Sequence, residues 1–217
     1  MEGIEFLKRG YKNLIVSFSS GVGRHGGVPR KEFLNTLEPL NTDILFVTDT
    51  IQTWFLYGIN SEIDTIEKLT EYLGQAIKEY DNVGFVGSSM GGYGAILFGQ
   101  LLNPNHCVAF SPQTFLSDEL REKYGEDRFP KYFHRLDNEK IEYYDLLNFK
   151  SENTTIDIYY GVKNRLDSLH SERMGQLKNV RLHPINSDAH NIASVIKEHF
   201  NLPNTIINSM LFMDLFT

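Results

Sequence analysis

Residues 83–98 read VGFVGSSMGGYGAILF, and this segment places a serine hydroxyl where it could act as a nucleophile. Ser89 lies at the centre of a G-x-S-x-G pattern, between the apolar run Val83–Val86 and a helix-like segment. A strand that turns sharply into a helix holds its middle residue strained and exposed, and Gly87 and Gly91 let the backbone cross closely there. The start of the helix would also offer free N–H groups to a developing oxyanion. The pattern therefore predicts that Ser89 is a nucleophile.

Two other readings of the motif are open. The chain contains 17 glycines, so the segment could be a glycine-rich helix start without chemistry. Ser88 is a second hydroxyl, but it occupies a variable position of the motif and would face a different side of the turn. An Asp and a His at suitable places downstream favour Ser89 as the nucleophile.

A serine nucleophile needs a base, usually a histidine oriented by a carboxylate. In sheets of this kind the order along the chain is Ser, then Asp or Glu, then His. His190 lies in a polar loop after the last expected strand and directly before the last expected helix. That position is at the carboxyl edge of the sheet, where ligands bind. We therefore expect His190 to be the base, whereas His183, within a strand, and His199, near a helix end, have structural roles.

The carboxylate should come from the loop after the preceding strand. Asp167 is the only acid in the loop 161–167. It could instead be the N-cap of a helix that begins near Leu169. Asp188 is the rival acid, but it lies two residues from His190 on one tight loop and is poorly placed to reach the far ring nitrogen. Asp167 is therefore the expected partner of the base.

An oxyanion hole needs two backbone donors. The first should be the N–H of Met90, the residue after the nucleophile. The second should come from the glycine-rich loop 18–27, where Ser20 and Gly21 are the candidates. His25 lies in the same loop, but the sequence contains no H-x-x-x-H or Cys/His ligand spacing, so we expect no metal site.

The segment 48–58 contains the only tryptophan and follows an expected strand. At the carboxyl end of that strand, Trp54 and Tyr57 could form a stacking wall for a sugar or an acyl group, with Asp49 as a hydroxyl partner. The alternative is that Trp54 anchors its loop onto the core.

Short β-branched and aromatic runs alternate with helical patterns, which predicts an α/β domain with a mostly parallel sheet flanked by helices. Strands are expected at 4–7, 13–18, 43–47, 83–86, 107–110, 155–161 and 180–183, and helices at 63–80, 92–102, 169–177 and 191–200. Residues 115–150 are charged, tyrosine-rich and helical in tendency. They are expected either as a small cap over the carboxyl edge or as a plain pair of surface helices.

The composition fits one domain over residues 1–217. A net charge of −7 and the absence of a Lys/Arg run argue against nucleic-acid binding, and Cys107 is the only cysteine. No signal peptide and no run of about 18 apolar residues is present, which favours a cytoplasmic protein without a membrane span. The apolar stretch 210–216 is expected to dock onto the domain or onto a partner.

In chain order, the Gly87–Gly91 motif, Asp167 and His190 resemble the α/β-hydrolase superfamily over nearly the whole chain. Further stretches are similar to small bacterial hydrolase-like proteins found with surface-polysaccharide genes, which include capsule O-acetyltransferases and the accessory secretion protein of adhesin O-acetylation. Those stretches are Ile15–Ser19, Thr48–Trp54, Gly87–Gly92, Arg181–Pro184 and His190–Asn191.

The resemblance implies an esterase or O-acetyltransferase that works through an acyl-enzyme on an acylated carbohydrate or surface polysaccharide. It implies no resident cofactor, with acetyl-CoA as the acyl donor if the chain is a transferase. The expected partner is a small-molecule or glycan acyl ester. A non-catalytic interaction protein that keeps the fold is the alternative, but folding alone does not require Ser, Asp and His together. The motifs leave open the acyl group, the donor, the acceptor and the oligomeric state.

Overall fold

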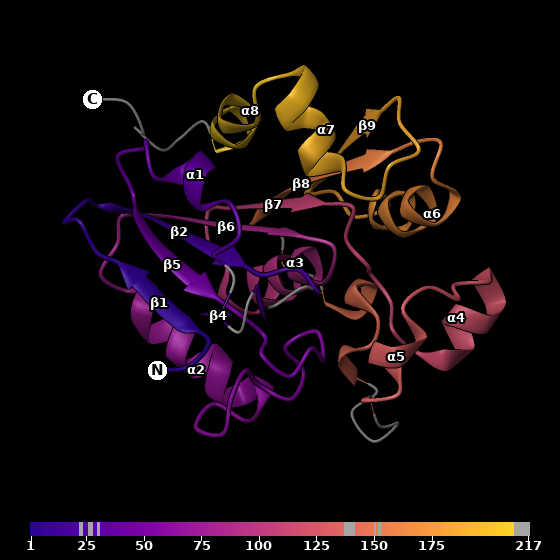
Figure 1. Ribbon diagram of the computed structural model, residues 1–217, viewed down its shortest axis with the longest axis horizontal. Coiled ribbons are helices and arrows are strands. Elements are labelled where there is room, and N and C mark those ends of the chain that lie inside the picture. The colour runs from indigo at the N-terminus through magenta and orange to yellow at the C-terminus, as the bar shows by residue number, and fades with distance from the viewer. Residues whose placement is uncertain are drawn as a thin grey trace.

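The computed structural model describes residues 1–21, 24–25, 28–29, 31–136, 142–149, 151 and 153–210. Its centre is a seven-stranded sheet in the order β1-β5-β2-β6-β7-β8-β9 (Figure 1). In chain order the strands are β1 (Ile4–Leu7), β2 (Asn13–Phe18), β5 (Asp43–Val47), β6 (Asn82–Ser88), β7 (His106–Phe110), β8 (Thr155–Gly161) and β9 (Val180–Ile185). Only β1 is antiparallel to its neighbour. The predicted α/β class with a mostly parallel sheet is confirmed.

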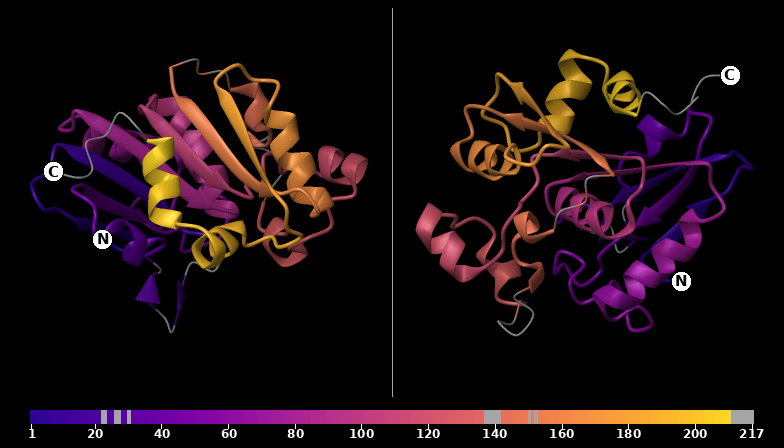
Figure 2. Two further views of the ribbon diagram at one scale, coloured as in Figure 1. Left: turned by 90° about the horizontal axis from the view of Figure 1, so that it is seen from above. Right: turned by 180° about the vertical axis from the view of Figure 1, so that it is seen from behind.

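Helices cover both faces of the sheet (Figures 1 and 2). One face carries α2 (Ile66–Ile77), α3 (Met90–Leu102) and α6 (Arg165–Met174), and the other carries α1 (Leu34–Leu37), α7 (Ile192–His199) and α8 (Leu202–Ser209). Side chains of a strand alternate between the faces, so Leu14 and Val16 join one core while Ile15 joins the other. Both faces of the central strands are buried, which explains their continuous apolar runs.

The parallel register brings the ends of the central strands to one edge. Phe18 pairs with Gly87, Ser88 with Phe110, and Phe110 with Tyr159. The loops that follow β2, β6, β7 and β8 therefore leave the sheet side by side, and residues from them can meet although they are far apart in the sequence.

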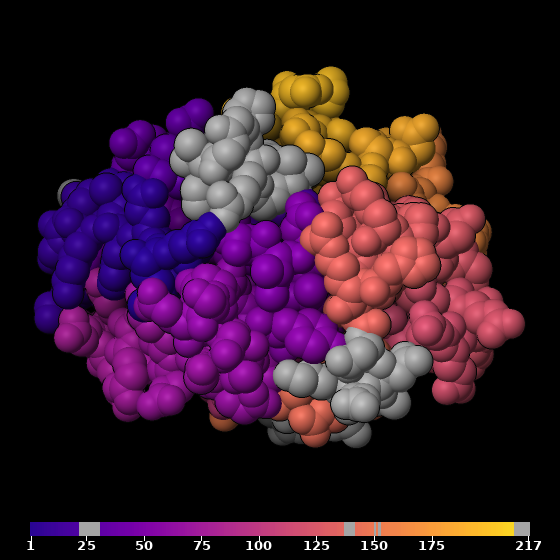
Figure 3. All heavy atoms as spheres, turned by 60° about the horizontal axis from the view of Figure 1, so that its bottom comes forward, coloured from indigo at the N-terminus to yellow at the C-terminus, as the bar shows by residue number. Residues whose placement is uncertain are grey.

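Between β7 and β8 the described residues form α4 (Asp118–Tyr124), α5 (Pro130–Phe133), the 3-10 turn η2 (Leu146–Asn148) and a bridge between Phe115 and Asp145. This segment lies beside the carboxyl edge of the sheet in Figures 1 and 2. Figure 3 shows the surface of this segment against that of earlier parts of the chain. One contact between them joins Arg135 to the loop after β5, because Arg135 Nη1 donates to the Ile51 carbonyl at 2.6 Å.

Two helices and a short hairpin were not expected from the sequence. The helix α1 has only four residues, too few for a periodic pattern, and α8 follows α7 after a short break at Asn201. The short hairpin consists of β3 (Arg24–His25) and β4 (Val28–Pro29). Met210 is buried, whereas the rest of the apolar stretch 210–216 lies outside the described residues. Within the described part of the chain, every helix is too short or too polar to cross a bilayer.

Candidate active site

Ser89 occupies a sharp turn between β6 and α3. Its backbone has φ 54° and ψ −118°, a conformation that a residue with a side chain rarely adopts. A Cβ atom added to Gly87 would lie 2.0 Å from the Gly91 carbonyl oxygen, and one added to Gly91 would lie 2.3 Å from the Phe18 carbonyl oxygen. Both glycines of the motif are therefore required by close backbone contact, and the turn they allow presents the Ser89 hydroxyl at the carboxyl edge.

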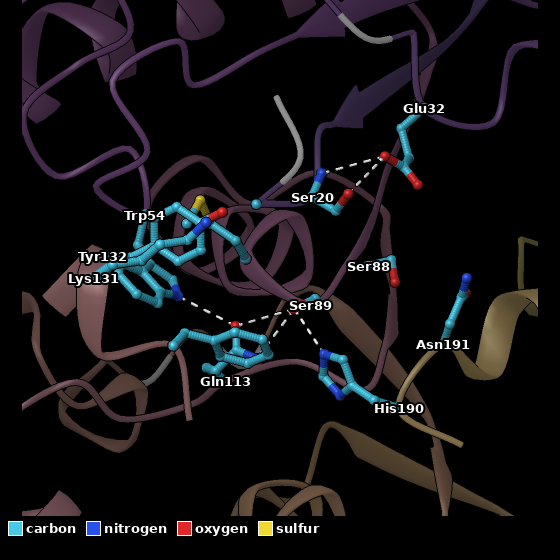
Figure 4. Close-up of a pocket in the computed structure, with 13 residues that line it drawn as sticks. Ser20, Glu32, Trp54, Ser88, Ser89, Gln113, Lys131, Tyr132, His190 and Asn191 are labelled. Atoms are coloured by element: carbon cyan, nitrogen blue, oxygen red, sulfur yellow. Dashed lines mark hydrogen bonds between the residues drawn. The ribbon is translucent and has the colours of Figure 1, made fainter. Parts of the chain in front are cut away.

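The Ser89 hydroxyl faces a histidine. Ser89 Oγ lies 2.9 Å from Nε2 of His190, in the loop between β9 and α7 (Figure 4). His190 Nδ1 lies 2.9 Å and 3.0 Å from the two carboxylate oxygens of Asp167. When Nδ1 donates its proton to that carboxylate, the Nε2 lone pair is free to accept the serine proton. The structure thus brings together the three side chains that the sequence singles out.

Asp167 can face His190 because it does not cap a helix. The N-cap of α6 is Asn164, whose side chain accepts the N–H of Asp167 at 3.2 Å, so this helix begins four residues earlier than expected. Asp167 lies in the first helical turn with its side chain fully buried. The rival acid, Asp188, instead offers its backbone carbonyl to the Asn164 side chain at 3.2 Å.

Asp167 also belongs to a buried network of charged groups with Arg128 and Glu126. Arg128 Nη1 donates to Asp167 Oδ1 at 2.7 Å, and Arg128 Nε donates to Glu126 at 3.0 Å. Glu126 also lies 2.9 Å from Nε2 of the buried His170. Burial alone would raise the pKa of Glu126, but hydrogen bonds from His170 and Arg128 outweigh burial and lower it to about 2. Burial also lowers the pKa of His170.

Glu126 and Arg128 were not expected at the site from the sequence. They lie in the charged segment 115–150, where neither spacing nor hydrophobic pattern distinguishes them from solvated surface charges. Gln113, in the loop after β7, was not expected either, and its Nε2 atom donates to Ser89 Oγ at 3.1 Å. These side chains are recognisable only from their contacts.

The residues expected to provide the oxyanion donors all line the pocket, but they differ in the hydrogen bonds that they already make. Met90 is the first residue of α3, so its N–H has no acceptor within the helix. The Ser20 N–H and hydroxyl both donate to the Glu32 carboxylate, at 3.3 Å and 3.0 Å (Figure 4). Gly21 also lines the pocket, and its carbonyl accepts from the Gln52 side chain at 2.5 Å. An oxyanion would therefore compete with Glu32 for the Ser20 N–H.

The pocket above Ser89 has a volume of about 410 Å³. Its lining combines the nucleophile region, a carboxylate, a lysine and three aromatic rings. The lining residues are Ser20, Gly21, Glu32, Trp54, Ser88, Ser89, Met90, Gln113, Phe129, Lys131, Tyr132, His190 and Asn191. Three of them, Phe129, Lys131 and Tyr132, come from the segment between β7 and β8. Among the described residues, His, Cys, Asp and Glu side chains form no group of three or more that could hold a metal ion.

Trp54 and Tyr57, the two residues expected to form a stacking wall, offer little or no ring surface to the pocket. Trp54 lines the pocket but is only 1% exposed, and the centroid of its ring lies 4.5 Å from that of Phe133, so it offers little area to a sugar. Tyr57 packs against the hydrophobic core and is not among the described residues that line the pocket. The more exposed aromatic rings at the pocket belong to Phe129 and Tyr132.

Asp49 organises its own loop and does not reach the pocket lining described above. Its buried carboxylate accepts N–H groups from four residues, Ile51, Gln52, Thr53 and Phe55, at 2.6–3.1 Å. Burial raises the pKa of Asp49, and these backbone hydrogen bonds oppose the rise. The side chain therefore shapes the turn that carries Trp54 and has no free oxygen edge for a substrate hydroxyl.

No protein-family model matches the sequence, and no curated protein matches it either. Solved structures do match. The capsule O-acetyltransferase of Neisseria meningitidis serogroup A superimposes with a TM-score of 0.68 at 20% identity, over 96% of this chain and 92% of that chain. The chain has the α/β-hydrolase-type fold. Carboxyl esterase 2 of the fungus Tuber melanosporum has a TM-score of 0.61 at 15% identity, over 89% of this chain and 75% of that one.

A third neighbour is the glycosylation-associated protein complex of Streptococcus agalactiae. The superposition has a TM-score of 0.64 at 18% identity. It covers 94% of this chain but only 43% of the matched chain. The capsule O-acetyltransferase has also been solved as a histidine-to-alanine mutant in complex with CoA, with a TM-score of 0.58 at 19% identity over 87% of this chain and 85% of that chain. At these identities the likeness concerns the fold, which agrees with the superfamily resemblance of the sequence.

Proposed function

We propose that the protein is a serine-dependent acyl-transfer enzyme, an esterase or an O-acetyltransferase, with Ser89, His190 and Asp167 as its catalytic triad. One observation carries the proposal. At a strained turn that opens into a pocket of about 410 Å³, Ser89 Oγ lies 2.9 Å from His190 Nε2, and His190 Nδ1 lies 2.9 Å from Asp167. Folding has no need of this chain of three groups, whereas acyl transfer needs all of them.

The chemistry takes two steps. In the first, the Ser89 hydroxyl proton passes to His190 Nε2 as Oγ bonds to the acyl carbon, and the leaving group departs with that proton. In the second, water or a sugar hydroxyl attacks the acyl carbon and gives its proton to His190, the Oγ–C bond breaks, and Ser89 recovers its proton. Asp167 stabilises the imidazolium in both steps, and the Met90 N–H with that of Gly21 or Ser20 binds the oxyanion.

We further propose that the acyl group is exchanged with a carbohydrate, with the segment 115–150 as a small cap over the site. The fold likeness to a capsule O-acetyltransferase and the aromatic rings of Phe129 and Tyr132 at the pocket support a sugar substrate. The CoA complex of the same acetyltransferase supports acetyl-CoA as the donor. The exposed ammonium group of Lys131 at the pocket has the charge that a phosphate of such a donor would require.

A fluorophosphonate probe tests the proposal directly. We expect one adduct, mapped by peptide mass spectrometry to Ser89, and turnover of a small acetyl ester that labelling abolishes. Adding glycan acceptors, with either the ester or acetyl-CoA as donor, then separates transfer from hydrolysis. Failure of the purified, folded protein to label or turn over any acyl ester would contradict the proposal and favour a non-catalytic protein that keeps the fold.

A further inference from the structure

A buried glutamine touches the oxygen that would carry out the chemistry. Gln113 follows β7 in the chain and is 1% exposed. Its side-chain Nε2 lies 3.1 Å from Ser89 Oγ. Its Oε1 lies 3.2 Å from the indole nitrogen of Trp54 and 3.4 Å from Ser89 Oγ (Figure 4). The proposed triad and oxyanion hole account for neither contact. Ser89 Oγ therefore has two side-chain neighbours at hydrogen-bond distance, His190 on one side and Gln113 on the other.

The contact with Trp54 fixes which end of the amide faces the serine. An indole N–H can only donate a hydrogen bond, whereas the two ends of a glutamine amide differ, one donating and one accepting. The Trp54 N–H therefore requires Oε1 on its side, which leaves the NH₂ group of Gln113 as the end of the amide nearer to Ser89 Oγ, at 3.1 Å against 3.4 Å for Oε1. Trp54 is itself held by its packing against Phe133. The amide is thus oriented before any substrate binds.

We propose that Gln113 is a further catalytic residue, whose amide N–H stabilises the negative charge that develops on Ser89 Oγ. The inference rests on the proposed acyl-transfer function. In the resting state the hydroxyl donates to His190 and accepts from Gln113, with one lone pair left for attack. A hydrogen bond to an ionised oxygen is about twice as strong as one to a neutral oxygen. The contact therefore stabilises the transition state more than the ground state.

The charge appears on Oγ twice in a turnover. It builds up first when the hydroxyl proton moves to His190 Nε2 before the bond to the acyl carbon is complete. It returns when the acyl-enzyme collapses, because Oγ is then the leaving group until His190 gives the proton back. Gln113 keeps its own protons throughout and needs no co-reactant.

The test replaces Gln113 with a residue of similar length that cannot donate. In Gln113→Met we expect the second-order rate of fluorophosphonate labelling at Ser89 to fall about 10- to 100-fold, the effect of losing a hydrogen bond to a charged oxygen. The kcat for a small acetyl ester should fall in parallel, while KM stays within about twofold. Gln113→Glu keeps the acceptor for Trp54 but places a carboxylate at Oγ, so its loss at neutral pH should be at least as large.

A second buried glutamine provides a matched control. Gln100 lies in α3 and donates to the carbonyls of Leu146 and Phe149 at 3.2 Å and 2.7 Å. Gln100→Met should lower the Tm yet leave both rates within about twofold of the wild type. Trp54→Phe should lower the rates about 3- to 10-fold, because the Gln113 amide is then free to turn.

Two results would overturn the inference. One is wild-type labelling by folded Gln113→Met or Gln113→Glu. The other is a loss in Gln100→Met as large as that in Gln113→Met, which would show a general packing effect. A wild-type protein that neither labels nor turns over would refute the proposed function itself, and is a different outcome.

Discussion

The guanidinium group of Arg128 lies 2.7 Å from the same Asp167 oxygen that faces His190 Nδ1 at 2.9 Å. One carboxylate therefore serves a histidine at the pocket and an arginine from the segment between α4 and α5. The second partner of Arg128 is Glu126, whose side chain is 1% exposed, as is that of Asp167. The positive charge of Arg128 neutralises two buried carboxylates, and its contacts connect the proposed cap to the proposed triad.

We expect Arg128→Met to be strongly destabilising, because it leaves two buried carboxylates without their cation. Removing one partner of a buried pair costs about 3–5 kcal/mol. The double variant Arg128→Met with Glu126→Gln should be more stable than Arg128→Met alone. Free energies of unfolding from urea titration measure both. In the exposed pair Lys68–Asp64, Lys68→Met should cost under about 0.5 kcal/mol. Equal costs for Arg128→Met and Lys68→Met would contradict this role of Arg128.

The two candidate carboxylates are separated by matched substitutions. Asp167→Asn should lower kcat/KM for a small acetyl ester by about 10³- to 10⁴-fold, because an amide cannot hold the productive tautomer of His190. Asp188→Asn should change kcat/KM by less than about twofold, since Asp188 uses its backbone carbonyl in the contact with Asn164. A severe loss in Asp188→Asn with a mild one in Asp167→Asn would reverse the assignment.

Replacing the proposed nucleophile should remove activity and show the strain at the turn. Ser89→Ala and Ser89→Gly should both lower ester turnover by several orders of magnitude. Ser89→Gly should be the more stable of the two by about 1 kcal/mol, because glycine adopts φ 54° without a Cβ penalty. Thermal and urea unfolding measure the difference. Undiminished turnover by purified Ser89→Ala would refute the nucleophile.

Because Trp54 is buried, we expect its removal to affect stability and not the choice between substrates. Trp54→Ala should cost about 3–5 kcal/mol of stability and lower turnover of glycan and small esters alike. Tyr132→Ala, at a partly exposed lining position, should instead raise KM for a glycan ester about 5- to 10-fold and leave a small acetyl ester within about twofold. Equal effects of Tyr132→Ala on both substrates would place the sugar elsewhere.

Stability should fall on the acid side because of Glu126. Its pKa is about 2 in the folded protein against an ordinary value of 4.5, so the unfolded chain binds the proton first as the pH drops. The stabilisation is fully present above about pH 4.5 and is lost toward pH 2, with a total of about 3 kcal/mol. The lowered pKa of His170 acts in the same direction below pH 6.5. Urea unfolding between pH 7 and pH 3 measures the loss, which should be smaller in Glu126→Gln than in the wild type.

The sequence by itself determined the layers of the fold and the edge at which Ser89, Asp167 and His190 meet. Each of those inferences depends on local features: a G-x-S-x-G turn between strand and helix, and polar residues directly after apolar runs. Strands 4–7, 13–18, 43–47 and 155–161 begin and end where the sequence predicts, because apolar and β-branched runs define a buried strand without reference to distant residues.

Only the tertiary structure decided what surrounds those three side chains. Gln113 meets Trp54 across 59 positions of sequence, and Arg128 meets Asp167 across 39. Such contacts depend on how the loops after parallel strands pack at one edge, which no periodic pattern records. The same packing buries Trp54 against Phe133 and pairs Ser20 with Glu32. Whether a polar side chain serves a substrate or the fold is set by its desolvated partners, and these are chosen in three dimensions.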